Sequence, residues 1–397
     1  MVALTGRADG RPVVPPGRAA TVARELAARF ADVTGVRVDG GRLLSERAAF
    51  TGHRRRGMIS VGGACRLLRT TDGWAAVSCG RPDDIALLGA VICRDVGNDP
   101  WPAVTRWLRE HTGVQLAERA ELLGVAAAPV RRRSIPPELP LPPLPEAPRS
   151  LEGMLVADFS ALWAGPLCAH LLGLAGARVV KVETPWRPDG ARRGDAAFYG
   201  LLHAGHRSVM LDPHTSGGRE AMAALVAAAD IVIESSRPRA LARFGLDAGA
   251  AAAAGTTWVS ITGYGRSSNR VGFGDDIAAG AGLMACDEDG RPVFCGDAIA
   301  DPLAGLAAAV AAASAPVGGA LLDVAMAEVV AATLDPVAAD DPQPSGAARR
   351  DGPGWVVDTA AGPLQVARPQ RRETPGSAFS QGENTAEVLA ELGLSHA

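Results

Sequence analysis

The sequence has few aromatic residues and little net charge. Only 4% of its 397 residues are aromatic while 47 are glycine, which favours helices and strands packed closely through small side chains. The formal net charge is −3 at pH 7, so we expect no general attraction to nucleic acid or to an anionic membrane. The hydrophobic fraction of 47% still permits a large core, and the length fits two or three domains.

The cysteines lack the spacing of a metal site or a disulfide framework. No pair is spaced as Cys-x-x-Cys, and no histidine cluster lies beside them. We therefore expect no zinc or other metal, and reduced thiols fit a cytoplasmic protein. The six are Cys65, Cys79, Cys93, Cys168, Cys286 and Cys295.

Long apolar runs are also missing. The N-terminal stretch MVALTGRADGRPVVPPGRAA has no apolar segment of the kind found in signal peptides. No uncharged run reaches the length of a membrane span, and the alanine-rich run at residues 303–313 is too short for one. We expect that run to pack inside the protein and expect no membrane partner.

Proline, in contrast, is concentrated in one stretch. RRRSIPPELPLPPLPEAPRS, residues 131–150, cannot form a helix or a central strand and predicts an extended linker. A proline-rich ligand for another protein is the alternative. Before this stretch, residues 1–130 combine helical spacing with a strand–turn–strand pattern, which predicts a small α+β domain.

From residue 151 onward, short apolar runs alternate with helical patterns. MLVADFS, RVVKVE, HRSVMLD, ADIVIES and TWVSITG predict strands, and AGPLCAHLLGLAGA and GGREAMAALVAAA predict helices. The alternation predicts an α/β large domain with a Rossmann-like parallel sheet, whose first part is residues 151–335. We expect a loop at residues 336–356 and the C-terminal part of the domain at residues 357–397. No G-x-G-x-x-G follows the first strand, so no dinucleotide site is predicted.

Two aspartates lie directly before the alanine-rich run. They are Asp297 and Asp301 in PVFCGDAIADPLAGL. Because Asp301 precedes a proline, one interpretation is the cap of a helix. The other is a nucleophile, since a carboxylate with an ordinary pKa is ionised at neutral pH without an activating base. The residues alone leave both interpretations open.

Six stretches from residue 151 onward carry a resemblance to a known family. They are LVADFSALWAGPLCAHLLGLAGARVVKVETP, HRSVMLD, ADIVIESSRPRALARFGLD, ITGYGRSSNRVGFGDDIAAGAGLM, PVFCGDAIADPLAG and GENTAEVLAELGL. Together, and in this order, they resemble the class III CoA transferases, the CaiB/BaiF family. The resemblance implies a Rossmann-like large domain with a smaller domain, which here corresponds to residues 1–130 and comes first in the chain. It also implies a homodimer.

The resemblance assigns Asp301 as the nucleophile that attacks an acyl-CoA thioester. It implies a mixed anhydride, then an aspartyl-CoA thioester, and finally transfer of CoA to a carboxylic acid. Asp297, one turn earlier, is the alternative nucleophile. A non-catalytic CoA-binding subunit is a competing hypothesis, since the order of the domains departs from the family's pattern.

A racemase or isomerase of the same fold is the other competing hypothesis. The family's racemase branch has a histidine where GFGDDIAAG places Asp275. An imidazole exchanges protons readily near neutral pH, whereas an ordinary aspartate is a poor acid there. The resemblance therefore favours the transferase.

The resemblance also implies where CoA binds. Arg243 corresponds to an arginine that meets the nucleotide, and the adenine pocket corresponds to Leu211 and His214. The phosphate and pantetheine arm corresponds to Ser235, Ser236 and the Gly165–Pro166 turn. The cations available for CoA phosphates are Lys181, Arg187, Arg192, Arg193, Arg207, Arg237, Arg239 and Arg243.

Overall fold

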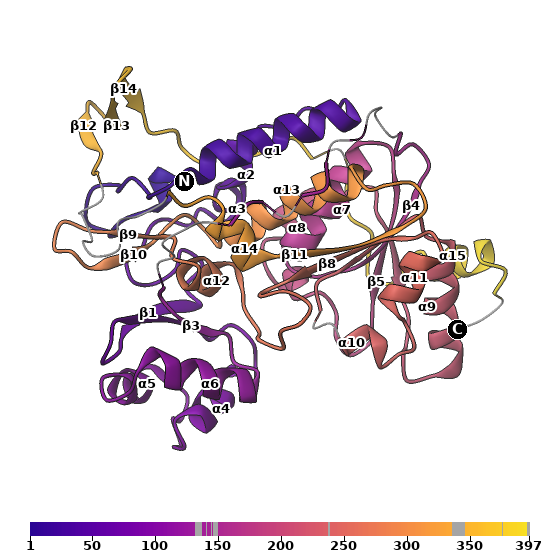
Figure 1. Ribbon diagram of the computed structural model, residues 1–397, viewed down its shortest axis with the longest axis horizontal. Coiled ribbons are helices and arrows are strands. Elements are labelled where there is room, and N and C mark those ends of the chain that lie inside the picture. The colour runs from indigo at the N-terminus through magenta and orange to yellow at the C-terminus, as the bar shows by residue number, and fades with distance from the viewer. Residues whose placement is uncertain are drawn as a thin grey trace.

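The computed structural model describes residues 1–131, 137–139, 141–143, 145, 150–236, 239–335, 346–374 and 376–394. A parallel sheet of six strands forms the centre of these residues, in the order β11-β8-β7-β4-β5-β6 (Figure 1). This confirms the predicted α/β fold class. The strands are β4 (Leu155–Phe159), β5 (Arg178–Glu183), β6 (Arg207–Met210), β7 (Ile231–Glu234), β8 (Thr257–Thr262) and β11 (Ala320–Ala325).

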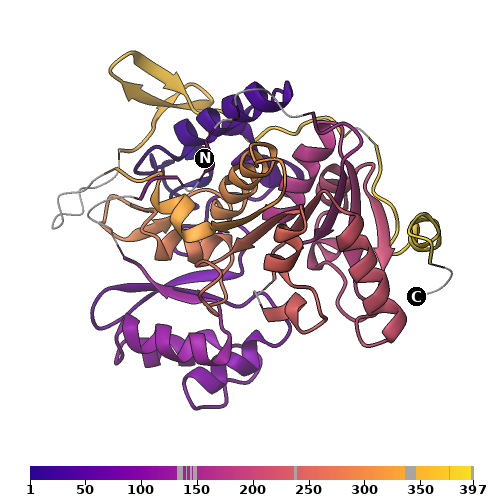
Figure 2. The ribbon, with the colours of Figure 1, turned by 45° about the vertical axis from the view of Figure 1, so that its right-hand side comes forward.

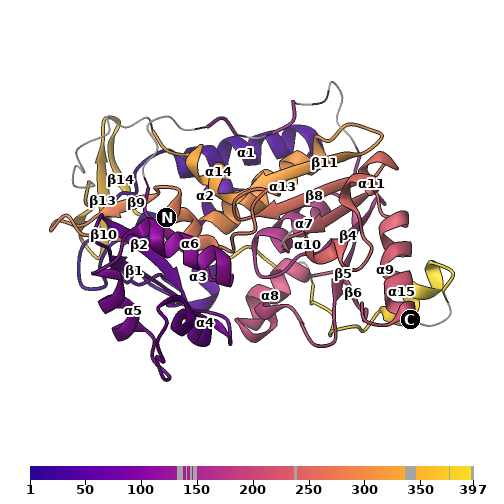
Figure 3. The same cartoon turned by 60° about the horizontal axis from the view of Figure 1, so that its bottom comes forward.

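The central strands are mostly apolar because helices cover both faces of the sheet. Along β7, Ile231 and Ile233 enter one core and Val232 enters the other, as alternation in a strand requires. The first core contains α1 (Ala19–Thr34), α7 (Ala164–Leu174), α13 (Ala300–Ala313) and α14 (Met326–Ala331). The second contains α9 (Ser216–Ala228), α11 (Ala248–Ala253) and α15 (Thr385–Glu391), which lie on the opposite side in Figure 3.

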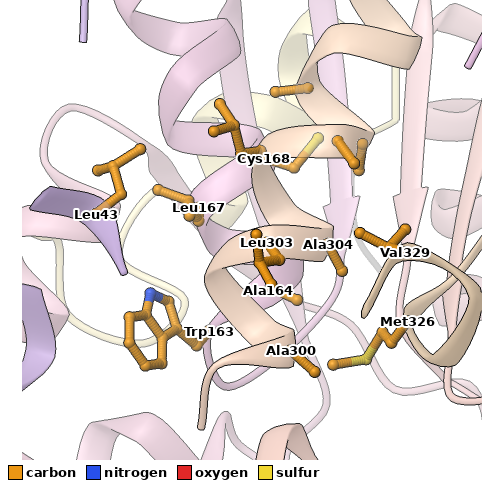
Figure 4. Packing of buried hydrophobic residues seen from close by; sticks show 14 of the residues in the cluster. Leu43, Trp163, Ala164, Leu167, Cys168, Ala300, Leu303, Ala304, Met326 and Val329 are labelled. Carbon is orange, nitrogen blue, oxygen red and sulfur yellow. The ribbon is translucent and has the colours of Figure 1, made fainter. Parts of the chain in front are cut away.

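The helix α13 lies at the middle of the first core. Its alanine and glycine residues are small, which lets α7 approach closely. At Gly305 there is no room for a side chain, because a Cβ would lie only 2.5 Å from the carbonyl oxygen of Ala164. Figure 4 shows the two helices side by side, with Trp163 and Ala164 beside Ala300 at their N-terminal ends. The alanine-rich run is therefore buried, as predicted.

Residues 1–51 do not belong to the small domain that the sequence predicted at 1–130. The helix α1 packs on α13, and its Val22, Leu26 and Phe30 lie in the first core of the large domain (Figure 1). The apolar face of α1 alone could not reveal this, because the small side chains that accept it lie about 280 residues later. Short helices complete the segment: η1 (Val2–Leu4), α2 (Gly40–Leu43) and α3 (Glu46–Thr51).

The remaining N-terminal residues form a small unit with its own core. Its three-stranded antiparallel sheet carries the predicted hairpin, β1 (Cys65–Arg69) and β2 (Trp74–Ser78), followed by β3 (Ala127–Pro129). The helices α4 (Asp84–Val91), α5 (Trp101–Leu108) and α6 (Gly113–Leu123) cover it. The small unit contacts the large domain through α12 (Gly274–Gly280), which packs on β2 and β3.

The predicted loop at residues 336–356 is partly wrong. Its residues 336–345 lie outside the described residues, but strands begin soon after them. An exposed antiparallel sheet of β12 (Arg349–Asp351), β13 (Gly354–Thr359) and β14 (Gly362–Gln365) projects from the body in Figure 2. The other short elements are η2 (Gly190–Arg193), α8 (Ala196–His203), α10 (Arg239–Ala242), β9 (Met284–Cys286) and β10 (Pro292–Phe294).

The predicted proline-rich linker lies partly outside the described residues. Of those described, Leu139 and Leu141 pack against the core of the large domain. Within the described chain, no helix is both long and apolar enough to cross a membrane.

Candidate active site

The carboxyl ends of the parallel strands form the first part of the site. From β4 the chain builds outward through β5 and β6, whereas β7, β8 and β11 extend the sheet in the other direction. In such sheets, ligands bind where the order reverses, here between β4 and β7. The loops after these two strands meet, since the backbone N–H of Ala161 donates to Oγ of Ser235 over 3.1 Å.

The predicted pantetheine residues lie at this switch point. Gly165 and Pro166 form the first turn of α7 and are buried. A Cβ at Gly165 would lie 2.1 Å from Cβ and Oγ of Ser160, so only glycine lets α7 begin so close to the strand. In the described chain, Oγ of Ser236 is one of several buried side-chain atoms without a hydrogen-bond partner.

The predicted adenine residues do not lie together. Leu211 is buried in the second core, between the sheet and its helices, and its side chain faces the protein interior. His214 is exposed, and its ring lies 5.5 Å from Trp186 and 6.1 Å from Phe244. Arg243 is also exposed and directly precedes Phe244. Trp186, 59% exposed, was missed by sequence reasoning, although its place just after β5 at the carboxyl edge could have signalled it.

Three of the predicted phosphate-binding cations have structural partners instead, and one of them is Arg207, whose Nη1 lies 2.6 Å from Glu391. Lys181 is buried, with Nζ 3.1 Å from Asp189 and 3.5 Å from Asp158. Arg192 forms an ion pair with Glu183. Arg237 lies outside the described residues. Four of the predicted cations are exposed: Arg187, Arg193, Arg239 and Arg243.

The second part of the site is a cluster of four aspartates at the N-terminus of α13. Asp301 lies within the first turn of α13 and is half-buried; the residue at the N-cap position is Ile299. The structure therefore does not support the capping interpretation of Asp301. A carboxylate in this position is stabilised by the helix dipole.

Of the other three aspartates, Asp276 and Asp297 are buried and Asp275 is half-buried, and all three already accept hydrogen bonds. Asp297 accepts a hydrogen bond of 2.9 Å from Nε of Arg47, whose Nη2 binds its second oxygen. Asp275 accepts from the backbone N–H of Ala298 over 2.9 Å. Asp276 accepts from Oγ of Ser78 over 2.7 Å and from the backbone N–H of Phe273 over 3.0 Å.

Burial makes the carboxylic acids of Asp275, Asp276 and Asp301 less acidic than those of aspartates in water. It raises the pKa of Asp301 to about 7; Arg47 opposes this, while the charges of Asp275, Asp297 and Asp276 add to it. Burial likewise raises the pKa of Asp275 to about 6 and that of Asp276 to about 7. The pKa of Asp301 therefore lies above the ordinary value on which the expectation from the sequence was based.

Among the described residues, no group of three or more His, Cys, Asp or Glu side chains is arranged to hold a metal ion. Two surface cavities of about 400 and 750 Å³ lie on the small unit, and none of their lining residues belongs to the aspartate cluster.

Two curated CoA-transferases are similar to part of the chain. The succinate–glutarate CoA-transferase of Agrobacterium fabrum is 32% identical over 183 residues, 41% of this chain and 46% of that protein. The succinyl-CoA–D-citramalate CoA-transferase of Chloroflexus aurantiacus is 31% identical over 179 residues, 42% of this chain and 44% of that protein. The chain thus spans less than half the length of these curated relatives.

One solved structure and one family model complete the comparisons, and the family model carries the assignment. A CaiB/BaiF family protein from Brucella suis is 28% identical, with a TM-score of 0.48 over 55% of this chain and 65% of that one. The model of CoA-transferase family III matches residues 151–362, more than half of the sequence. The chain therefore belongs to CoA-transferase family III.

Proposed function

We propose that the protein transfers CoA from an acyl-CoA thioester to a carboxylic acid, with Asp301 as the nucleophile. The observation that carries the proposal is the contrast between the two candidate aspartates. Asp297 is fully buried and both its oxygens are bound by Arg47, whereas Asp301 is half-buried at the start of a helix. Only the second carboxylate has a face open to a substrate.

The proposed reaction exchanges one acyl bond at a time. A carboxylate oxygen of Asp301 attacks the thioester carbonyl, the C–S bond breaks, and CoA leaves as a thiolate. The thiolate then attacks Cγ of Asp301 in the mixed anhydride, which releases the donor acid and leaves an aspartyl-CoA thioester. The acceptor carboxylate repeats these two steps in reverse and leaves with CoA, which regenerates the aspartate. Two of the attacks use an ionised carboxylate, that of Asp301 or of the acceptor acid, and the other two use the CoA thiolate.

The CoA molecule would lie along the carboxyl edge of the sheet. Trp186, His214 and Phe244 offer rings for the adenine, and Arg243 offers a cation for its phosphates. The pantetheine arm would pass Ser235, Ser236 and the Gly165–Pro166 turn. That turn starts α7, whose N-terminus lies beside the N-terminus of α13 (Figure 4), so the thioester end of the arm would approach Asp301.

Trapping of the covalent intermediate tests this proposal. The protein is incubated with a panel of acyl-CoA thioesters, treated with hydroxylamine or borohydride, and digested for mass spectrometry. A label on Asp301 that disappears in Asp301→Ala is the expected result. A label on Asp297 would keep the route but change the nucleophile. CoA binding without any label would instead favour a non-catalytic subunit.

One observation keeps a proton-shift reaction as a second candidate. Because burial raises the pKa of Asp275 to about 6, this residue is a better acid near neutral pH than an ordinary aspartate. An acyl-CoA racemase or isomerase would exchange hydrogen at the carbon next to the thioester. Deuterium incorporation there in D₂O, without an Asp301 label, would favour this candidate.

We also propose a cytoplasmic homodimer that needs no metal, on the basis of composition and family membership. Light scattering coupled to gel filtration measures the mass of the assembly. Activity that survives chelation supports the absence of a metal requirement.

A further inference from the structure

We propose that Arg47 is a positioning residue for the candidate nucleophile: it fixes Asp297, and through it the first turn of α13, and places a cation beside the carboxylate of Asp301. The inference rests on the proposed function and extends it to the N-terminal segment. Residue 47 lies outside residues 151–362, where the family model matches, so the family assignment does not include it.

Arg47 is held from three sides. It lies on α3, and its Nε and Nη2 bind the two oxygens of Asp297, 250 residues further along the chain. Its guanidinium lies 4.9 Å from the ring centroid of Trp163, the residue that precedes α7. The helix α3 is itself fixed, because Arg372 donates to both oxygens of Glu46 over 2.7 and 2.8 Å. A planar guanidinium bound on one edge and one face has little freedom to move.

The connection from Asp297 to Asp301 is short and constrained. The next residue, Ala298, has a φ of 43°, and its N–H donates to Asp275. Its carbonyl oxygen accepts a hydrogen bond of 2.9 Å from the N–H of Asp301. Arg47 therefore fixes the residue directly before a four-residue turn, residues 298–301, whose last residue is the proposed nucleophile.

The guanidinium also balances charge. Within the described chain, the charged groups that act on Asp301 are Asp275 and Asp276 from α12, Asp297 from the turn and Arg47 from α3, so Arg47 is the cation among them. The elements packed beside them contribute neutral groups: Ser78 from β2, Trp163 before α7, and Cys65 of β1 next to the two α12 aspartates. Loss of Arg47 would leave four carboxylates together without this cation.

Opposite substitutions of the two partners distinguish a charge role from a structural one. We would titrate the protein labelled with ¹³C at the aspartate carboxyl carbons and identify Asp301 by its absence in Asp301→Asn. Arg47→Met is expected to raise the titration midpoint of Asp301 by about one pH unit, and Asp297→Asn is expected to lower it. The double variant should return the midpoint towards the wild-type value, and Arg47→Lys should shift it less than Arg47→Met.

Labelling by acyl-CoA supplies the functional readout. At pH 7, Arg47→Met should slow labelling of Asp301 about fivefold. Near pH 9 the variant should recover most of the rate, because Asp301 is then mostly ionised again. Arg42→Met is the matched control: Arg42 lies on the neighbouring helix α2, is 61% exposed and pairs with Asp39, so no change is expected. If Arg47→Met does not fold, Arg47→Lys, Asp297→Asn and the double variant carry the test.

The outcomes separate this inference from the proposed function. Shifts of equal sign in the two single variants, or an unmoved midpoint, overturn the role of Arg47 even if the wild-type protein labels on Asp301. A wild-type protein that never labels, but whose midpoints move in opposite directions, keeps the charge role and overturns the proposed reaction.

Discussion

The backbone of Gly274 lies directly against the carboxylate of Asp301. A Cβ on Gly274 would stand 2.2 Å from Oδ2 of Asp301 and 2.5 Å from the carbonyl oxygen of Ala298. Real Cβ atoms essentially never come so close to another heavy atom, so the first turns of α12 and α13 can meet only through a glycine. The position of the proposed nucleophile therefore depends on a residue without a side chain.

Gly274→Ala should displace the carboxylate of Asp301 and strongly reduce labelling by acyl-CoA. A shift of about 1 Å in a reacting group can cost about 100-fold in rate, while overpacking costs about 1–3 kcal/mol of stability. Labelling rate and thermal unfolding are measured together. Gly200→Ala in α8 is the control, because a Cβ there meets no atom within 4 Å. An unchanged labelling rate in Gly274→Ala would contradict the proposed role of Asp301.

The rate of labelling should rise with pH through a midpoint near 7. Burial and the neighbouring aspartates raise the pKa of Asp301 to about 7 despite Arg47, and only the ionised form attacks the thioester. Single-turnover labelling between pH 5.5 and 8.5, with a constant amount of one acyl-CoA, gives the profile. A rate that stays constant down to pH 5 would mean that the attacking carboxylate has an ordinary pKa.

Asp301→Asn should stabilise the protein, and more so at pH 7.5 than at pH 5. The pKa of Asp301 is higher in the folded chain than in the unfolded chain, so its contribution to stability is greatest at low pH and falls as pH rises towards 7. Asparagine does not ionise, so the variant does not lose this contribution to stability as the pH rises. Melting temperatures of both proteins across this range provide the check, and a difference that shrinks with rising pH would show that the sign is wrong.

Trp186→Ala should weaken CoA binding by about threefold to tenfold, because an aromatic stacking contact contributes about 0.5–1.5 kcal/mol. Calorimetric titration with CoA measures the affinity. Trp355→Ala, on the projecting strand β13, is the matched control and should bind CoA normally. Equal affinities of the wild type and Trp186→Ala would exclude the Trp186–His214–Phe244 row as the adenine site.

Phe30→Ala should destabilise the large domain rather than the small unit. The side chain of Phe30 is fully buried in the first core, and such truncations cost about 3–5 kcal/mol. Hydrogen exchange of peptides from β7 and β8 should become faster, with smaller changes in β1 and β2. Leu122→Ala, at an 83% exposed position, should leave both unchanged.

Local patterns determined much of the large domain. The apolar runs of β4 to β8 and the helices between them were predictable, because each strand is buried on both faces and each helix shows its own amphipathic spacing. The order of short stretches around Asp301 was also sufficient to indicate the family that the family model then matched.

Only the tertiary structure decided which distant residues share the site. Arg47 and Asp297 are separated by 250 positions, and no local pattern relates them. The same holds for α1. Its apolar face does not indicate which part of the protein it packs against, and only the structure shows that this is α13. It also holds for Leu211 and Lys181, which the fold buries in structural roles, and for the raised pKa of Asp301. Sequence records spacing along the chain, whereas burial and electrostatic coupling depend on distances through space, and these exist only once the chain has folded.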